Sequence, residues 1–232
     1  MNKGRLVVLA GPSCVGKSPL SKALARLYPE LGAGLQPLVL YNSRAPRPGE
    51  QDGVDYHFRT REEIEALRGQ ERYAVLDVRG DLQALDLEEL GASLARGDVF
   101  FEGNPFVGAL LLSHPALEGV EKLGVFMTPL SVEELAFLAE QPGVKVEEVV
   151  AEVMRRKLLR RMRRQKGELA LGDLEEVERR ATSAYQELGE AQRFEHVITN
   201  HDGEDSENWA AFYHPLGEAR LALLRFVELL EG

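Results

Sequence analysis

The sequence predicts an α/β fold with a mostly parallel central sheet, and three observations lead to this expectation. Short apolar runs rich in β-branched residues alternate with amphipathic helical patterns, as in chains that build parallel sheets. The first apolar run ends in a glycine-containing turn that opens directly into a helical pattern. The 232 residues are 44% apolar and 28% charged, which is typical of a chain with a substantial hydrophobic core.

The predicted strands are short, as strands buried on both faces usually are. The clearest is residues 5–10, an apolar run closed by Gly11 and Pro12. Residues 45–53 are rich in glycine and proline and predict a surface loop that turns into a short strand at 55–58. Further strand candidates are residues 38–41, 73–78, 99–102, 123–127 and 196–199.

Helix starts are marked by capping boxes, in which a hydroxyl accepts from an early backbone N–H and a glutamate reaches back. Thr60 with Glu63, and Ser131 with Glu134, have this spacing. Helices are also expected from Lys17 onward and at 216–230. The longest helical pattern spans residues 144–162, and its apolar stripe consists of Val146, Val150, Met154, Leu158 and Met162.

The net charge of −10 is distributed unevenly. Residues 155–166 contain eight basic residues and no acidic one, so the rest of the chain is more acidic than the total suggests. An acidic chain is not expected to bind nucleic acid as a whole, and most of these charges fit a solvated helix face. A specific contact of this segment with RNA or DNA stays open as an alternative.

The single cysteine, Cys14, excludes an intramolecular disulfide and a multi-cysteine zinc site. A reducing, cytoplasmic location fits this cysteine usage. No apolar run approaches the ~18 residues that a membrane span needs, so no membrane partner is expected. The sequence predicts no particular oligomeric state.

The turn after the first strand has the pattern G-x-x-x-x-G-K-[ST], as Gly11-Pro-Ser-Cys-Val-Gly16-Lys17-Ser18. Its glycines let backbone N–H groups curl around a phosphate, the lysine reaches the β and γ oxygens, and the serine hydroxyl ligates Mg²⁺. Pro19 lacks the N–H that could reach the α-phosphate, so we expect weaker nucleotide binding. The predicted nucleotide-binding residues are Gly11, Ser13, Cys14, Val15, Gly16, Lys17 and Ser18.

A second motif follows as Ser43-Arg44-x-Pro-Arg47-x-Gly-Glu50-x-x-Gly53-x-Asp-Tyr56-x-Phe58. Two arginines three residues apart, with a tyrosine nearby, can hold one phosphate through charge-assisted hydrogen bonds. We therefore expect Arg44, Arg47 and Tyr56 to bind an acceptor phosphate.

With both motifs the chain resembles the guanylate kinase family, and the likeness resumes at residues 180–188 and 197–200. The resemblance covers most of residues 4–60 and 173–201. It implies a P-loop kinase that transfers the γ-phosphoryl of MgATP to GMP or dGMP. It also implies a core (1–36, 96–130 and 181–232), a small acceptor-binding subdomain (37–95) and a helical lid (131–180).

The resemblance assigns further roles by position. Arg161 and Arg164 match the lid arginines, and Arg180 would neutralise the transferring phosphoryl together with Lys17. Asn200 sits where the family holds the adenine. Glu102, at an acidic strand end, is grouped with the acceptor site and could also orient the water shell of the metal.

The positions with which the family reads guanine are altered. They carry Leu40 (or Tyr41), Ala74, Asn104 and Gln83-Ala84-Leu85. Each unmade buried hydrogen bond costs ~1–3 kcal/mol, so guanine preference is expected to weaken. Two alternatives follow: a kinase for another phosphorylated acceptor, such as a modified nucleotide or a sugar phosphate, and a non-catalytic binding module. Residues 139–155 and 203–217 look like insertions.

Overall fold

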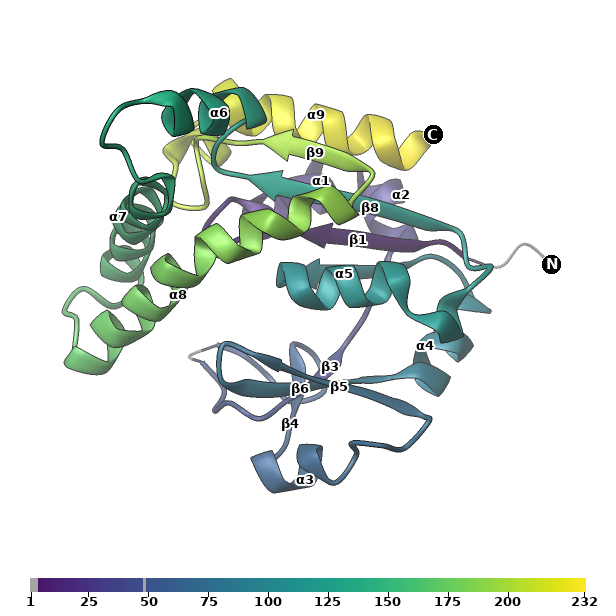
Figure 1. Cartoon of the computed structure of the whole chain (residues 1–232). Coiled ribbons are helices and arrows are strands. Elements are labelled where there is room, and N and C mark those ends of the chain that lie inside the picture. The colour runs from purple at the N-terminus through teal and green to yellow at the C-terminus, as the bar shows by residue number, and fades with distance from the viewer. Residues whose placement is uncertain (1–3, 48) are drawn as a thin grey trace.

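The computed structural model describes residues 4–47 and 49–232. The first three residues of the predicted core and Pro48 of the arginine motif lie outside the described residues. The chain forms a five-stranded sheet and a separate four-stranded sheet, with helices packed around both (Figure 1). The predicted α/β class with a mostly parallel sheet is confirmed.

The main sheet is parallel throughout, in the order β2-β7-β1-β8-β9. Its strands are β1 (Leu6–Ala10), β2 (Gln36–Pro37), β7 (Val99–Gly103), β8 (Lys122–Thr128) and β9 (His196–Thr199). Every residue of β1 is buried, because alternate side chains enter two different hydrophobic clusters. Leu6 and Val8 enter one cluster, and Val7 and Leu9 the other, so both faces of the sheet are covered.

Helices cover the two faces. On one face α1 (Lys17–Leu27) and α9 (Gly217–Glu231) pack, and α2 (Pro29–Gly34) lies beside α1. The other face carries α4 (Leu87–Leu94) and α5 (Pro105–Ser113). Short 3₁₀ turns occur at Pro115–Leu117, Glu190–Arg193 and Glu207–Trp209. None of the helices in the described part of the chain combines the length and apolarity that crossing a bilayer requires.

The second sheet has the order β4-β3-β6-β5 and lies wholly within residues 37–95. It consists of β3 (Leu40–Asn42), β4 (Tyr56–Phe58), β5 (Tyr73–Val78) and β6 (Asp81–Asp86), with α3 (Arg61–Glu65) beside it. The expectation that residues 38–41 and 73–78 are buried parallel strands was wrong in part. β3 and β5 both pair antiparallel with β6, and most of β5 is only half-buried.

Three helices make up the remaining part: α6 (Val132–Glu140), α7 (Val146–Lys166) and α8 (Leu171–Gly189). The last two run side by side as a long hairpin that projects from the main sheet (Figure 1). Val150, Met154, Leu158 and Met162 are buried, so the predicted apolar stripe faces its partners. The division into core, acceptor subdomain and lid stays a prediction.

The segment 203–217 closes over the start of α1 and α9. Trp209 is buried and its Nε1 donates to the Gly203 carbonyl at 2.7 Å, as expected for local packing. Phe212 and Tyr213 are exposed instead.

Candidate functional site

The phosphate loop lies between the end of β1 and the start of α1, where the motif predicts it. Gly16 has a φ of 108°, and an added Cβ would lie 2.5 Å from Asn200 Nδ2, so only glycine fits. Cys14 also has a positive φ, and burial raises the pKa of its thiol to about 12. This thiol is therefore protonated at neutral pH and fills space in the loop.

Lys17 points back into the loop. Its Nζ donates to the carbonyls of Gly11 and Pro12 at 2.7 and 2.8 Å. Burial lowers the pKa of Lys17, and the nearby Glu102 and Glu204 carboxylates oppose that effect. Within the described part of the chain, this ammonium group contacts the two loop carbonyls and forms no ion pair with a carboxylate, so it is available to a phosphate that enters the loop.

Ser18 and Glu102 meet beside the loop. Ser18 Oγ donates to Glu102 Oε1 at 2.6 Å, and Ser21 Oγ donates to Oε2 at 2.7 Å. The prediction grouped Glu102 with the acceptor ligands, but the structure places it here because β7 and β1 are neighbours and their carboxyl ends meet.

A hydroxyl in the first turn of α1 and a carboxylate at the end of β7 are oxygen ligands that suit Mg²⁺. Within residues 4–47 and 49–232, no group of three or more His, Cys, Asp or Glu side chains is arranged to hold a metal. A magnesium ion at Ser18 and Glu102 would therefore take its other ligands from nucleotide phosphates and water.

The side chains of Arg44, Arg47, Glu50 and Tyr56 cluster at the edge of the second sheet, and this cluster is called the arginine cage below. Arg44 makes a bidentate ion pair with Glu50, at 2.6 and 2.7 Å, and its guanidinium lies 5.1 Å from the centre of the Tyr56 ring. Burial alone would lower the pKa of Arg44, but the Glu50 pair raises it on balance. For Arg47, burial and the charge of Arg44 lower the pKa to about 10. Arg44, Arg47 and Tyr56 thus lie together, as their spacing predicts.

The lid arginines separate. Arg161 lies in the pocket and donates to Glu204 Oε2 at 2.9 Å, and Arg180 is almost fully buried in the same pocket. Arg164 is exposed and lines a neighbouring groove with Arg156 and Arg160, which lie on the same side of α7 at a spacing of four residues. The structure therefore does not bring Arg164 to the phosphate loop, and its catalytic role stays a prediction.

Asn200 lies beneath the phosphate loop. Its side chain is fully buried, and Nδ2 donates to the Val15 carbonyl at 2.8 Å. The structure thus gives Asn200 a supporting contact with the loop and no open surface for an adenine. The segment after Asn200 continues this support, because Glu204 N donates to the Cys14 carbonyl at 2.9 Å.

Arg79 is a site residue that the sequence reasoning missed. It occupies the β5–β6 turn with a φ of 57°, and its Nη1 donates to Ser13 Oγ of the phosphate loop at 3.1 Å. Its Nε donates to Glu187 Oε1 at 2.6 Å, and that carboxylate is fully buried. Asn104 Nδ2 also donates to Glu187, at 3.3 Å. The sequence carries no local signal for this contact, because Arg79-Gly80 is an uncommon hairpin turn and Glu187 is 108 residues away.

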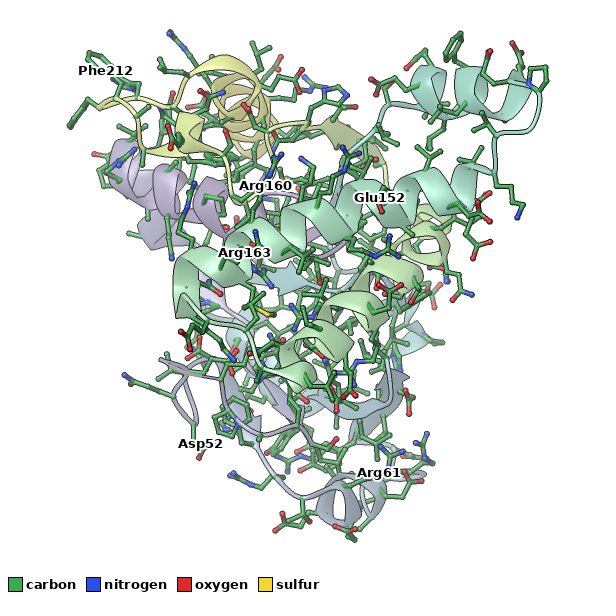
Figure 2. The ribbon with its side chains drawn as sticks, turned by 90° about the vertical axis from the view of Figure 1, so that its left-hand side faces the viewer. Asp52, Arg61, Glu152, Arg160, Arg163 and Phe212 are labelled. Carbon is green, nitrogen blue, oxygen red and sulfur yellow. The ribbon has the colours of Figure 1, made fainter. Side chains whose placement is uncertain are left out.

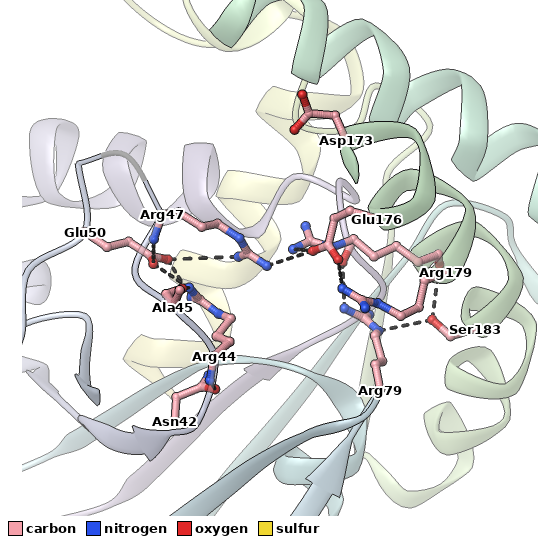
Figure 3. A network of polar contacts seen from close by, with 12 residues as sticks. Asn42, Arg44, Ala45, Arg47, Glu50, Arg79, Asp173, Glu176, Arg179 and Ser183 are labelled. Atoms are coloured by element: carbon pink, nitrogen blue, oxygen red, sulfur yellow. Dashed lines mark hydrogen bonds and ion pairs between the residues drawn. The ribbon is translucent and has the colours of Figure 1, made fainter. Parts of the chain in front are cut away.

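Lys17 and Ser18 of the phosphate loop, the arginine motif, Arg79, Arg161 and Arg180 line one pocket of about 180 Å³. Glu102, Asn200 and Arg164 do not line it. The pocket joins the phosphate loop to the arginine cage and to the start of α8. Glu176 of α8 pairs with Arg47 of the cage and with Arg179 and Arg180 of its own helix (Figure 3). The pocket is strongly cationic, and its basic members are Lys17, Arg44, Arg47, Arg79, Arg161, Arg179 and Arg180.

A second cavity, of about 620 Å³, runs along the basic half of α7. Figure 2 shows Arg160 and Arg163 on this outer face of the helix, with Glu152 further along it. Asp202 and Asp205 line the opposite wall, and the closest Arg160–Asp205 approach is 3.9 Å.

Comparisons with known proteins agree on one family. The family model described as Guanylate kinase matches residues 3–80. A guanylate kinase of Synechococcus sp. (strain JA-3-3Ab) is 32% identical over 217 residues, covering 92% of this chain and 84% of that protein. One from Corynebacterium diphtheriae is 31% identical, covering 87% of this chain and 89% of its own length.

The fold also matches a solved structure. The crystal structure of guanylate kinase from Anaplasma phagocytophilum aligns with a TM-score of 0.54 at 17% identity. The alignment covers 100% of this chain and 86% of that chain. At this identity the likeness concerns the fold alone.

Proposed function

We propose, from the premise that this chain belongs to the guanylate kinase family, that it phosphorylates a small acceptor which already carries a phosphate. The chain is an ATP-dependent kinase. A nucleoside monophosphate is the first candidate acceptor, with GMP or dGMP as the family default. The observation that carries the proposal is the single cationic pocket that joins Lys17 and Ser18 to the Arg44–Arg47 cage.

In this proposal the chain works by positioning and electrostatics. The phosphate loop and Lys17 hold the donor phosphates, and Arg44, Arg47 and Tyr56 hold the acceptor phosphate. An acceptor phosphate oxygen attacks the γ-phosphorus as the bond to the β–γ bridging oxygen breaks. Arg161 and Arg180 are placed to neutralise the charge that spreads over the transferred group.

Ser18 and Glu102 would hold Mg²⁺, which when bound neutralises charge on the β and γ oxygens. Their contact holds the carboxylate at the end of β7 against the first turn of α1, so both oxygen ligands lie beside the phosphate loop. The intact Lys17, Ser18 and Glu102 favour an enzyme over a non-catalytic module.

A specific observation favours the alternative of a different phosphorylated acceptor. Leu40 and Leu85, at two guanine-reading positions of the family, are buried in the main hydrophobic cluster. Ala74 packs against the same cluster, and the amide of Asn104 donates to Glu187. The arginine motif is kept, while three of the guanine-reading positions are apolar and Asn104 pairs with Glu187. Gln83, another of these positions, is a polar residue that lines the pocket.

The test is MgATP consumption with a panel of acceptors: GMP, dGMP, the other nucleoside monophosphates and sugar phosphates. We expect turnover with at least one of them, and none in Lys17→Ala, because that variant lacks the charge facing the donor phosphates. Thermal unfolding of Lys17→Ala checks that its fold is intact. Unchanged kcat in Lys17→Ala would refute the mechanism, and silence across the panel would favour the binding module.

A further inference from the structure

Glu176 is a carboxylate of α8 that lies between Arg47 of the arginine cage and two arginines of its own helix (Figure 3). Its Oε1 lies 3.1 Å from Arg47 Nη2 and also pairs with Arg180, and its Oε2 pairs with Arg179. The partners come from two separate parts of the chain, since Arg47 belongs to the loop before β4 and the other two belong to α8. Because Glu176 itself is on α8, its ion pair with Arg47 connects the loop beside the second sheet to the helical hairpin.

Glu176 occupies the position in which an anionic ligand would contact Arg47 and Arg180. Arg47 and Arg180 are residues to which the proposed function gives the acceptor phosphate and the transferring phosphoryl. Arg180 is almost fully buried and Arg47 is about half-exposed, and Glu176 supplies the negative charge that pairs with both guanidinium groups. A phosphate that binds Arg47 must take over the bond that Glu176 now accepts.

Glu50, the carboxylate of the cage itself, differs from Glu176 in how it is held. Glu50 accepts the bidentate pair of Arg44 and also the backbone N–H of Arg47 at 2.7 Å, all within its own loop. Among the described residues, Glu176 pairs with the side chains of Arg179 and Arg180 on its own helix and with the side chain of Arg47. Glu50 therefore also holds the backbone of its own loop. The contact of Glu176 with Arg47 joins two side chains, so a ligand can replace it without disturbing that backbone.

We propose that Glu176 stands in for the acceptor phosphate and is the specificity residue of the cage. An incoming acceptor must displace a carboxylate from Arg47, so a dianionic phosphate succeeds where a singly charged anion does not. This inference rests on the proposed function for the identity of the displaced position.

The experiment measures the binding of inorganic phosphate by calorimetry, without ATP and without turnover. Glu176→Gln keeps the shape of the side chain and removes the competing charge, so phosphate should bind roughly three- to ten-fold more tightly. The matched control is Glu178→Gln on the same helix, because Glu178 pairs with Arg155 of α7, outside the cage. Phosphate affinity in Glu178→Gln should equal that of the wild type.

A double variant assigns the gain to the cage. In the Arg47→Ala background, adding Glu176→Gln should change phosphate affinity by less than two-fold, roughly, because the contested guanidinium is gone. A phosphate held only by the phosphate loop would show the same gain in both backgrounds, which would overturn the proposal.

Two other outcomes decide the matter. Unchanged or weaker phosphate binding in Glu176→Gln, with Glu176→Ala weaker still, would show that the glutamate only orients the arginines, and the proposal would fail. Tighter phosphate binding without turnover of any acceptor would support the inference and count against the proposed kinase reaction. The two can therefore fail separately.

Discussion

The Arg79–Glu187 pair shows how one long-range contact can hold a site together. Glu187 is fully buried, and the side chain of Arg79 is 15% exposed while reaching Ser13 of the phosphate loop. We expect Glu187→Gln to lower the free energy of unfolding by about 2–3 kcal/mol, because the arginine keeps its charge and loses its partner. Chemical denaturation at neutral pH measures this loss.

The control for this prediction is the double variant Arg79→Met/Glu187→Gln. Removing the stranded charge as well should recover part of the stability that Glu187→Gln loses. If the double variant is less stable than Glu187→Gln by the full cost of Arg79→Met alone, the two side chains do not act as a pair.

The positions of site residues follow from the sequence where they belong to a local motif. Lys17, Ser18, Arg44 and Arg47 lie where their spacing places them. The sequence does not predict the position of Arg79, whose partner Glu187 is 108 residues away, because no local pattern encodes such a contact. Glu204 was missed for the same reason, since its partner Arg161 is 43 residues away in the sequence. Of the partners of Glu176, Arg179 and Arg180 are neighbours on the same helix, and Arg47 is 129 residues away.

At the scale of elements, His201 joins two helices that are distant in the chain. Its Nδ1 lies 2.7 Å from Glu218 of α9, and its Nε2 lies 2.8 Å from Glu134 of α6. Burial alone would lower the pKa of His201, but the two carboxylates raise it on balance. When it is protonated, His201 thus links the first turns of α6 and α9 through two ion pairs.

The sign of the pH effect follows from this raised pKa. The stabilisation from His201 is fully present below its unfolded pKa of ~6.5 and is lost as pH rises through the higher folded pKa. Urea unfolding midpoints should therefore fall more between about pH 6 and about pH 8.5 in the wild type than in His201→Gln. The exposed His214→Gln is the control and should follow the wild type. Parallel pH profiles for wild type and His201→Gln would contradict the link.

The elements that the sequence predicts best are those with their own local chemistry. Both predicted capping boxes form, at Thr60 and at Ser131, because each involves residues of a single turn. β6 was missed, and residues 83–85 were aligned with a loop, because Arg79-Gly80 is an uncommon hairpin turn and the strand alternates polar and apolar residues irregularly. Tertiary pairing with β3 and β5 decides its conformation.

At the scale of the whole molecule, the pocket gathers positive charge in a chain whose total is −10. The phosphate loop of the main sheet, the cage of the second sheet and the arginines of α7 and α8 all face it. The carboxylates Glu50, Glu176 and Glu204 form ion pairs with arginines around this pocket. A phosphate-bearing ligand that contacts several parts at once should therefore stabilise the folded chain as a unit.

This yields a prediction that separates a kinase from a non-catalytic module without knowledge of the acceptor. A ligand present at ~100 times its Kd stabilises the native state by ~2.7 kcal/mol, provided that the unfolded chain does not bind it. For a chain of this length that corresponds to a rise in Tm of about 5–10 °C with MgATP. Differential scanning fluorimetry with increasing MgATP measures the shift.

Two lysines of α1 make the matched comparison for this measurement. Lys17 faces the loop, and Lys22 is exposed one turn later on the same helix. Lys17→Ala should lose most of the MgATP-dependent shift, whereas Lys22→Ala should keep it, because only Lys17 is placed to contact the β and γ oxygens. Equal shifts in both variants would mean that the nucleotide binds outside the phosphate loop. No shift in the wild type at saturating MgATP would mean that the loop is kept for its shape and that the pocket binds an acceptor-like anion alone.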